Sequence, residues 1–155
     1  MGNQRKAIDT QKHKIRHAQQ LLEQLDKQES HTMISTIVVS ELLRDVDLDV
    51  QIDLFDVLQK RFIIVPFCAR AALECAMISK QHDMKHPKQD LNSFHSNTAI
   101  KADWMILATA LANGVEILYT EDKALTNMAE LVKDRIAVEP IPVPIQTDLF
   151  EVLDS

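Results

Sequence analysis

Three acidic side chains stand at positions where a charge is hard to accommodate. Glu41 interrupts the apolar run 37–43, Asp103 begins the nearly apolar segment 102–112, and Asp122 closely follows the apolar run 115–119. A charged side chain is rarely kept in a buried segment without a partner. Carboxylates that converge without a matching cluster of Lys or Arg suit a hard cation, and Mg²⁺ and Mn²⁺ prefer oxygen ligands. A divalent metal held in this way suits phosphodiester hydrolysis, because the metal activates water and stabilises the attacking and leaving oxygens.

Each acid also has a purely structural interpretation. Asp103 could complement the dipole at a helix N-terminus, and Asp122 could cap the helix that follows it. Glu41 could pair with Arg44 or Lys101. Taken singly these interpretations are favoured, but three acids expected at one edge of a sheet favour a metal site.

Hydrophobic periodicity indicates the elements that position these acids. The stretch 46–54 alternates apolar and polar residues as a strand does, but its aspartates are poor strand formers, and we favour a helix there. The expected elements are helices at 12–27, 37–45, 51–60, 69–80, 103–112 and 123–133, strands within 31–36, 62–67, 115–120 and 135–143, and a polar, mainly loop segment at 81–98. Ala72, Leu73, Ala76 and Met77 share one face of the helix at 69–80. Alternation of this kind predicts an α/β fold with a parallel sheet and helices on both of its faces.

The order of the elements brings the acids together. Gly114 after Asn113 is a good helix C-cap that reverses the chain at once, so the start of the helix lies near the end of the next strand. Asp103 and Asp122 therefore both belong to the carboxyl edge of the sheet. The strand ending near Thr36 feeds the helix that holds Glu41, which starts at the same edge. Open α/β folds bind ligands at this edge.

Length and composition are those of an ordinary globular protein. The chain has 155 residues and a net charge of −6, which suits one domain, residues 1–155, with a real core. It has no apolar run long enough to span a bilayer, and its polar, basic start without an apolar stretch argues against a secretory signal, so we expect no membrane partner. Cys68 and Cys75 are best interpreted as buried, reduced thiols, in keeping with a cytoplasmic location.

The first 20 residues are basic, with a net charge of +4 in an otherwise acidic chain. Their basic side chains are Arg5, Lys6, Lys12, Lys14 and Arg16. They could bind the phosphates of a nucleic acid. A solvated helix face explains them at least as well.

Five segments, in this order, resemble the PIN-domain nucleases. They are "STIVVSELL", "FIIVPF", "ARAALECAMI", "KADWMILATALANGVEILYTED" and "RIAVEPIPV". The resemblance covers about residues 15–143, leaving a basic lead-in at 1–12 and a tail at 144–155, and its most specific part is "ADWMILATALANGVEILYTED". It implies a Rossmann-like, three-layer α/β/α domain and cleavage of RNA that depends on Mg²⁺ or Mn²⁺. The acidic motif of the family falls on Glu41, Asp103 and Asp122, and Thr120 matches its polar neighbour that positions the substrate.

The chain departs from the family pattern at its start. The family opens with a mid-sheet apolar strand that ends in an Asp, the first metal ligand. Asp9-Thr10 follows no such strand, so we expect the chain to begin after it. We also expect a gap in the sheet beside "HTMIST" or beside the strand at 115–120.

The leading hypothesis is therefore a PIN-type endoribonuclease, the toxin of a toxin–antitoxin pair. The alternatives are an inactive PIN-like remnant or RNA-binding module, and a small α/β binding protein unrelated to nucleic acid. The candidate partners are an RNA substrate, an antitoxin protein and a second copy of the chain.

Overall fold

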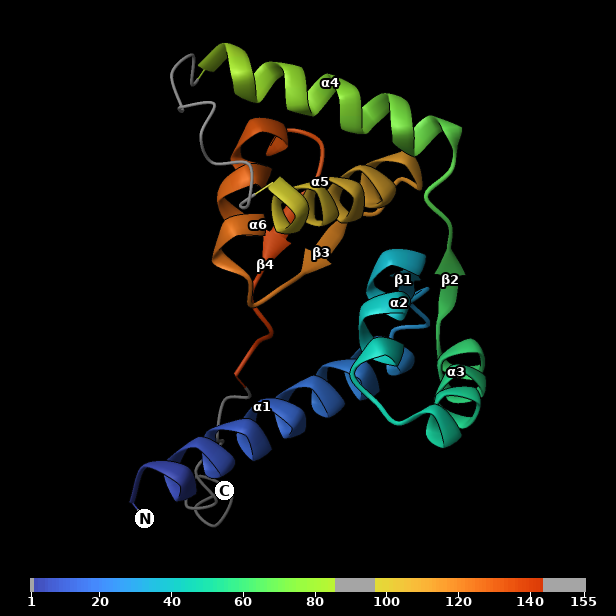
Figure 1. Ribbon diagram of the computed structural model, residues 1–155, viewed down its shortest axis with the longest axis vertical. Helices are drawn as coiled ribbons and strands as arrows, with labels where there is room; N and C mark the ends of the chain where they lie inside the picture. The colour runs from blue at the N-terminus through green and yellow to red at the C-terminus, as the bar shows by residue number, and fades with distance from the viewer. Residues whose placement is uncertain (1, 86–96, 144–155) are drawn as a thin grey trace, which may run out of the picture. The chain divides into compact units, whose positions relative to one another are not determined.

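The computed structural model describes residues 2–85 and 97–143 (Figure 1). The described residues divide into two compact units: residues 2–30 with 141–143, and residues 31–85 with 97–140. The first unit contains helix α1 (Gly2–Lys27), which begins ten residues before the expected start at residue 12. On α1 the side chain of Leu21 is buried, while Lys12, Lys14 and Arg16 are exposed.

The second unit begins with a pair of parallel strands. Strand β1 (Met33–Ser35) pairs with β2 (Ile63–Val65), and the strands are joined by helices α2 (Thr36–Arg44) and α3 (Leu48–Arg61). The hydroxyl of Ser35 caps α2 by accepting a hydrogen bond from the N–H of Val38 at 3.2 Å. The alternating stretch 46–54 could have formed a strand, but we favoured a helix there. Helix α3 confirms this prediction.

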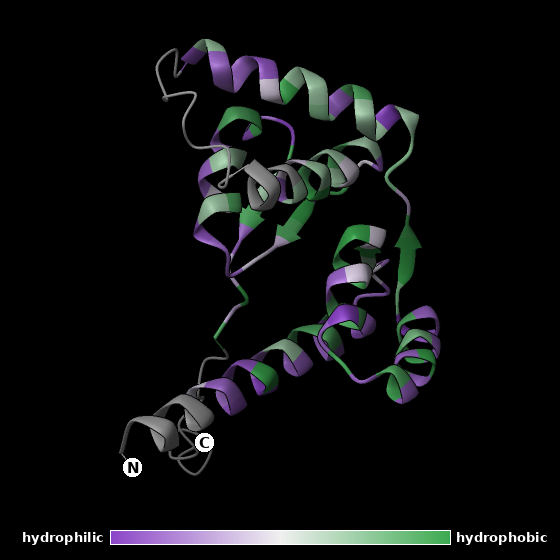
Figure 2. Cartoon of the chain, viewed as in Figure 1, coloured by the Kyte–Doolittle hydropathy of each residue, from purple (hydrophilic) through white to green (hydrophobic). Residues whose placement is uncertain are grey.

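A second parallel pair follows later in the chain. Strand β3 (Ile117–Tyr119) pairs with β4 (Ala137–Glu139), and between them lie helix α6 (Lys123–Ala129) and the 3₁₀ turn η1 (Glu130–Val132). Figure 2 shows the apolar colouring of β2 and β3. The α/β fold with parallel strands is thus confirmed.

The sheet is interrupted. Within residues 2–85 and 97–143, β1 pairs only with β2 and β3 only with β4, so the strands form two sheets of two strands each. We expected one parallel sheet that lacks a strand beside "HTMIST" or beside the strand at 115–120. Among the described residues, each of these two strands therefore has one edge without a neighbouring strand.

The core is built around helix α5 (Asn97–Ala112), which packs against helices α2, α4 and α6 and against strand β1. Leu107 and Ala108 on α5 are fully buried. Thr109 is also buried, and its hydroxyl donates to the carbonyl oxygen of Met105 at 2.7 Å, so its polar group is satisfied. The core cluster comprises Ile78, Trp104, Leu107, Ala108, Ala110, Leu111, Leu125, Met128, Ala129, Val132 and Ile136.

Helix α4 (Ala69–Lys85) is longer than the helix expected at 69–80. It continues to Lys85, so residues 81–85 are helical, whereas the rest of the expected loop at 86–96 lies outside the described residues. Leu73 and Met77 share one apolar face of the helix, but this face is not the buried one, because the two residues are 63% and 49% exposed. The helix instead buries Ala71 and Ile78.

The expected burial of both thiols is wrong for Cys68. Cys68 lies just before α4 and is exposed, whereas Cys75 lies on the helix and is half-buried.

Helix α5 also begins earlier than expected, at Asn97 rather than at Asp103. The polar residues before Asp103 hid this start, because Asn and Thr are weak helix formers away from a helix end. Asp103 therefore lies in the second turn of α5.

A two-point ion pair ties α4 to the turn before β4. Arg135 donates from Nη1 and Nη2 to the two carboxylate oxygens of Glu74 at 2.8 and 2.7 Å. The side chain of Glu74 is only 13% exposed, whereas that of Arg135 is 46% exposed. The hydrogen bonds from Arg135 lower the pKa of Glu74.

Replacing Arg135 by Ala should lower the free energy of unfolding at neutral pH by about 1–2 kcal/mol, since it leaves a mostly buried carboxylate unpaired. Because the pKa of Glu74 is depressed in the folded state, this contribution is present above its ordinary value of 4.5 and is lost as the pH falls further. Urea titrations at neutral and acidic pH measure it, with the exposed Lys133→Ala as the control. A loss that persists undiminished in acid would contradict the ion-pair explanation.

Gly114 closes α5 in the left-handed conformation, with φ of +66°. A Cβ atom placed there would meet no atom within 4 Å, so the obstacle to a side chain is the backbone conformation alone. Gly114→Ala is therefore expected to lower the free energy of unfolding by about 1–2 kcal/mol. Thermal unfolding measures this loss, and Gly114→Asn should recover part of it because Asn tolerates this region better. Equal stability of the Ala and Gly proteins would contradict the assignment.

Candidate functional site

Asp122 stands at the turn from β3 into α6. Its Oδ1 accepts hydrogen bonds from the N–H groups of Ala124 at 2.6 Å and Leu125 at 3.1 Å, so the carboxylate caps α6. The capping interpretation of Asp122 is thus confirmed. Both bonds use Oδ1 rather than Oδ2, and the residue is exposed, so capping leaves the carboxylate open to a cation.

Thr120 holds this turn in shape. Its Oγ1 accepts a hydrogen bond from the N–H of Asp122 at 3.1 Å, and its own N–H donates to the carbonyl oxygen of Glu139 on β4 at 2.9 Å. Thr120 therefore orients the backbone that presents Asp122. Its expected role toward a substrate stays a prediction.

Asp103 is half-buried on α5, directly before the buried Trp104. Burial raises the pKa of the Asp103 carboxyl above its ordinary value, and the negative charges of Asp122 and then Glu41 raise it further. Three carboxylates from α5, from the end of β3 and from α2 therefore share one electrostatic environment. Since Asp103 lies in the second turn, interaction with the helix dipole, which is confined to the first turn, does not explain it.

Glu41 is half-buried on α2. Arg44, one of its two expected partners, instead contacts Asp45, with 3.4 Å between Nε and Oδ1. The side chain of the other candidate, Lys101, lies outside the described part of the chain. Glu41 is connected to the other two acids through its negative charge, which raises the pKa of Asp103.

Glu41, Asp103 and Asp122 do not lie close enough together to bind one metal ion in this structure. Across residues 2–85 and 97–143, no three His, Cys, Asp or Glu side chains are grouped closely enough to hold one ion. The donor types suit a hard cation, and a cation would relieve the repulsion that raises the pKa of Asp103. The side chains would have to move closer together to share one ion. The metal site stays a prediction.

The basic residues near the N-terminus belong to α1, in the other compact unit. Lys12, Lys14 and Arg16 are exposed. The side chains of Arg5 and Lys6 lie outside the described part. A nucleic-acid-binding role for the five stays a prediction.

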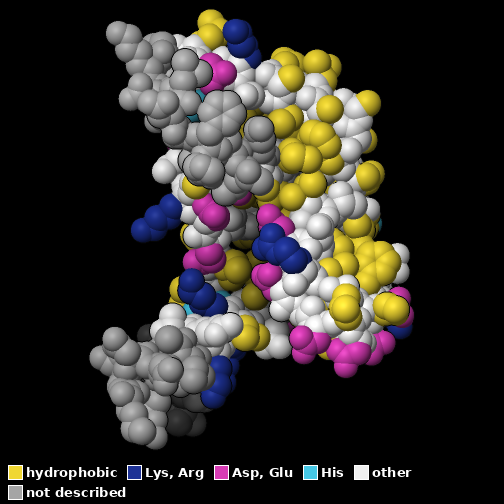
Figure 3. All heavy atoms as spheres, viewed as in Figure 1, with side chains coloured by type: hydrophobic (Ala, Val, Ile, Leu, Met, Phe, Trp, Pro, Cys, Tyr) yellow, Lys and Arg dark blue, Asp and Glu magenta, His cyan; other side chains and the backbone are white. Residues whose placement is uncertain are grey.

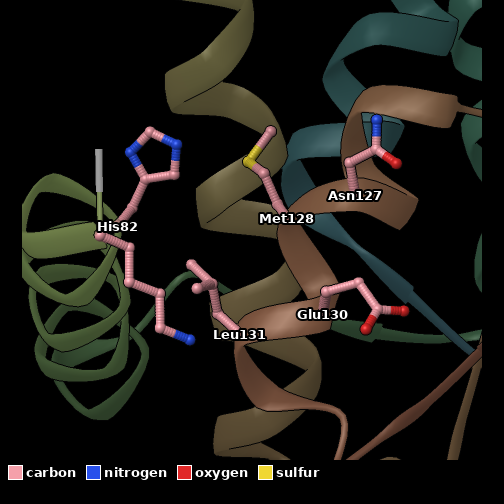
Figure 4. Close-up of a pocket in the computed structure, with 6 residues that line it drawn as sticks. His82, Asn127, Met128, Glu130 and Leu131 are labelled. Carbon is pink, nitrogen blue, oxygen red and sulfur yellow. The ribbon is translucent and has the colours of Figure 1, made fainter. Parts of the chain in front are cut away.

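A pocket of about 320 Å³ lies between the end of α4 and the segment from α6 to η1 (Figure 4). Its lining residues are His82, Lys85, Asn127, Met128, Glu130 and Leu131. It contains none of the predicted acids. His82 was expected on a surface loop, but it is helical and partly buried, with its ring edge-on to Trp104 at 5.2 Å between centroids. Its position four residues after the buried Ile78 is the sequence signal that could have revealed this.

Comparison with known proteins defines the class of this protein. The PIN domain family model matches residues 7–131, so the chain belongs to the PIN domain family. The fold also resembles that in the crystal structure of VapBC2 from Rickettsia felis bound to a DNA fragment from their promoter. The TM-score is 0.55 at 18% sequence identity, over 79% of this chain and 83% of that chain. No curated protein matches the sequence. Among the described helices, none is long and apolar enough to cross a membrane.

Proposed function

We propose that this protein is a metal-dependent endoribonuclease of the PIN type, with Glu41, Asp103 and Asp122 as the ligands of Mg²⁺ or Mn²⁺. The observation that carries the proposal is the raised pKa of Asp103, caused partly by the negative charges of the other two acids. These acids come from three separate segments of the chain. Membership of a family whose domains are typically nucleases supports the same reading.

The roles of the residues follow from their positions. A bound Mg²⁺ or Mn²⁺ would supply Lewis acidity toward the scissile phosphate and lower the pKa of a bound water. Asp103 offers a half-buried carboxylate whose charge is already disfavoured, and Asp122 offers a carboxylate fixed by its cap. Thr120 keeps the turn of Asp122 in position through the hydrogen bond to the Asp122 N–H.

The test measures Mn²⁺ binding and cleavage of single-stranded RNA by the whole chain. The parent should cleave RNA with Mn²⁺ and stop when the metal is chelated. Glu41→Gln should weaken both cleavage and Mn²⁺ binding, the latter followed by electron paramagnetic resonance. Asp56→Asn, which removes an exposed acid from α3, is the matched control and should change neither. Equal Mn²⁺ affinity of the parent and Glu41→Gln would rule out Glu41 as a ligand.

A second candidate is an inactive PIN-like remnant or RNA-binding module. It is favoured by the absence, in the described ranges, of three side chains grouped on one ion position. In that case RNA binds without being cleaved, and the logarithm of the affinity falls linearly with that of the salt concentration. Replacing Lys12, Lys14 and Arg16 by Gln together should then reduce this slope. Cleavage by the purified parent chain that is lost in Asp103→Asn would exclude this candidate.

We further propose that the protein is the toxin of a toxin–antitoxin pair and acts in the cytoplasm. The structural neighbour is a VapBC complex. A ribonuclease that cleaves the RNA of the cell that makes it would need an inhibitor there. The candidate partners are then an antitoxin protein and a second copy of the chain. Growth arrest on expression of the parent, relieved in Asp103→Asn, would support the toxin assignment. Equal growth with both would contradict it.

A further inference from the structure

Helix α1 carries a row of polar and charged side chains on the face opposite its buried residue. Positions i, i+4, i+7 and i+11 lie on one face of a helix, and the row follows this spacing. Leu21, which α1 buries, lies on the other side of the helix. The row consists of Lys12, Arg16, Gln19 and Glu23, all exposed, and we call it the α1 stripe.

Helix α3 has a row with the same spacing and the opposite charges. Its buried residue, Leu58, again lies on the other side of the helix. Figure 3 shows acidic side chains gathered where α3 lies, with hydrophobic side chains beside them. The row consists of Asp49, Asp53, Asp56 and Lys60, all exposed, and we call it the α3 stripe.

The two stripes complement each other when the helices run side by side in the same direction. Because their spacing is the same, every member of one stripe then lies level with a member of the other. In the antiparallel direction, a match of the two cations with the acids leaves Glu23 beyond the start of α3 and far from Lys60. In the parallel arrangement Lys12 lies level with Asp49, Arg16 with Asp53, Gln19 with Asp56 and Glu23 with Lys60.

The charges of both stripes are available for such a contact. Across residues 2–85 and 97–143, none of the charged members takes part in an ion pair. Each stripe also faces away from the side that its own helix buries. A helix that keeps its apolar face covered therefore presents its stripe outward, where a second molecule can reach it.

Exposed aliphatic side chains flank the α3 stripe on both sides and would be partly covered by a docked helix. Leu48 and Ile52, on one side, are 83% and 72% exposed, and Val50 and Val57, on the other, are 45% and 59% exposed. Ile15 beside the α1 stripe is 53% exposed. Exposed ion pairs contribute little individually, so this apolar area adds to the affinity while the charges set the direction and register.

The charge pattern selects the occupant. A nucleic acid would be attracted by the two cations of the α1 stripe but repelled by Glu23 and by the acids of the α3 stripe. A second copy of the chain offers the complement of both stripes, and in a two-fold dimer the contact occurs twice. We propose that the α1 stripe of one copy docks in parallel on the α3 stripe of a second copy. The contact does not require nuclease activity, because no proposed metal ligand belongs to either stripe.

Charge reversal in the full chain tests the contact. The parent should dimerise in sedimentation velocity runs at low salt, and less so as salt is added. Lys12→Glu with Arg16→Glu should weaken dimerisation by at least about tenfold, and so should Asp49→Lys with Asp53→Lys, because each double variant sets like charges against each other. An equal mixture of the two double variants should dimerise as the parent does, since both contacts of the mixed dimer again join opposite charges.

The matched control reverses two exposed lysines outside the stripes. Lys14→Glu with Lys85→Glu should leave dimerisation unchanged, because Lys14 lies on another side of α1 and Lys85 lies on α4. Circular dichroism checks that every variant is folded. Recovery in the mixture also shows that neither double variant lost dimerisation through unfolding.

Three results would refute the proposal, whether or not the protein cleaves RNA. The first is a parent chain that stays monomeric at low salt. The second is a mixture that stays monomeric while all four substitutions in one chain restore the dimer, which would place the contact within a single chain. The third is a Lys12→Glu, Arg16→Glu variant that dimerises normally but no longer binds RNA, which would make nucleic acid the occupant of the α1 stripe.

Discussion

Replacing Asp103 by Asn should reduce Mn²⁺-dependent RNA cleavage by at least about a hundredfold, as loss of charge stabilisation at a reacting centre does. The amide keeps the shape of the side chain and removes the charge that would hold the metal. Rates of cleavage with saturating RNA and Mn²⁺ measure the effect. A variant that cleaves RNA as fast as the parent would refute the assignment of Asp103 to the site.

The same substitution should stabilise the fold at neutral pH. Because the pKa of Asp103 is raised in the folded state, ionising it costs free energy there that it does not cost in the unfolded chain. This penalty is present above the raised pKa and disappears as the pH falls below the ordinary value of 3.8. Asp103→Asn should therefore gain at most about 1 kcal/mol at pH 7, since the group is partly exposed, and should gain nothing in strong acid.

The opposite signs of these two effects separate a functional carboxylate from a structural one. A residue kept only for stability would lose stability when it is changed to Asn. Asp122 provides the comparison, because its Oδ1 caps α6 and Asn is nearly as good a cap. Asp122→Asn is therefore expected to leave stability nearly unchanged while it impairs cleavage.

Leu107→Ala should lower the free energy of unfolding by about 2–5 kcal/mol, the range found for truncating a large aliphatic residue in a core. Leu107 has no exposed surface and lies in the middle of α5, the helix at the centre of the core. The midpoint of urea unfolding measures the loss. Leu73→Ala is the matched control, because its side chain is 63% exposed and its truncation should cost about 0.5 kcal/mol or less. Similar midpoints for the two variants would show that α5 does not organise the core as described.

Elements whose signal is local could be predicted from the sequence. Ser35 is of a residue type favoured at helix N-caps and does cap α2, and Gly114 ends α5 in the conformation that its lack of a side chain permits. The strands at β2 and β3 follow from short apolar runs bounded by turn residues. In each case the physical cause lies within a few residues of the effect.

The errors arise where the cause is distant in the sequence. Both faces of α4 are apolar, so periodicity shows that Leu73 and Ile78 lie on apolar faces but not which face meets α5. The position of the acids could be expected from the order of the elements, which brings Asp103 and Asp122 to one edge. The distances between the acids could not be predicted in this way. They depend on how α2 and α5 pack and on side-chain rotamers, which no local sequence pattern specifies.

The division of the strands into two separate pairs, β1 with β2 and β3 with β4, has a consequence for how the backbone exchanges its hydrogens with solvent. Each of these three-residue strands is hydrogen-bonded to one neighbouring strand, and the described residues provide none for its other edge. Amides on those free edges should exchange their protons for deuterium through local openings, at rates far above that of global unfolding. Amides of α5 around Leu107 should exchange slowest, because only global opening exposes them. The protein would thus show one slowly exchanging helix and fast-exchanging strand edges, in contrast to the usual α/β pattern in which the central strands are the most protected.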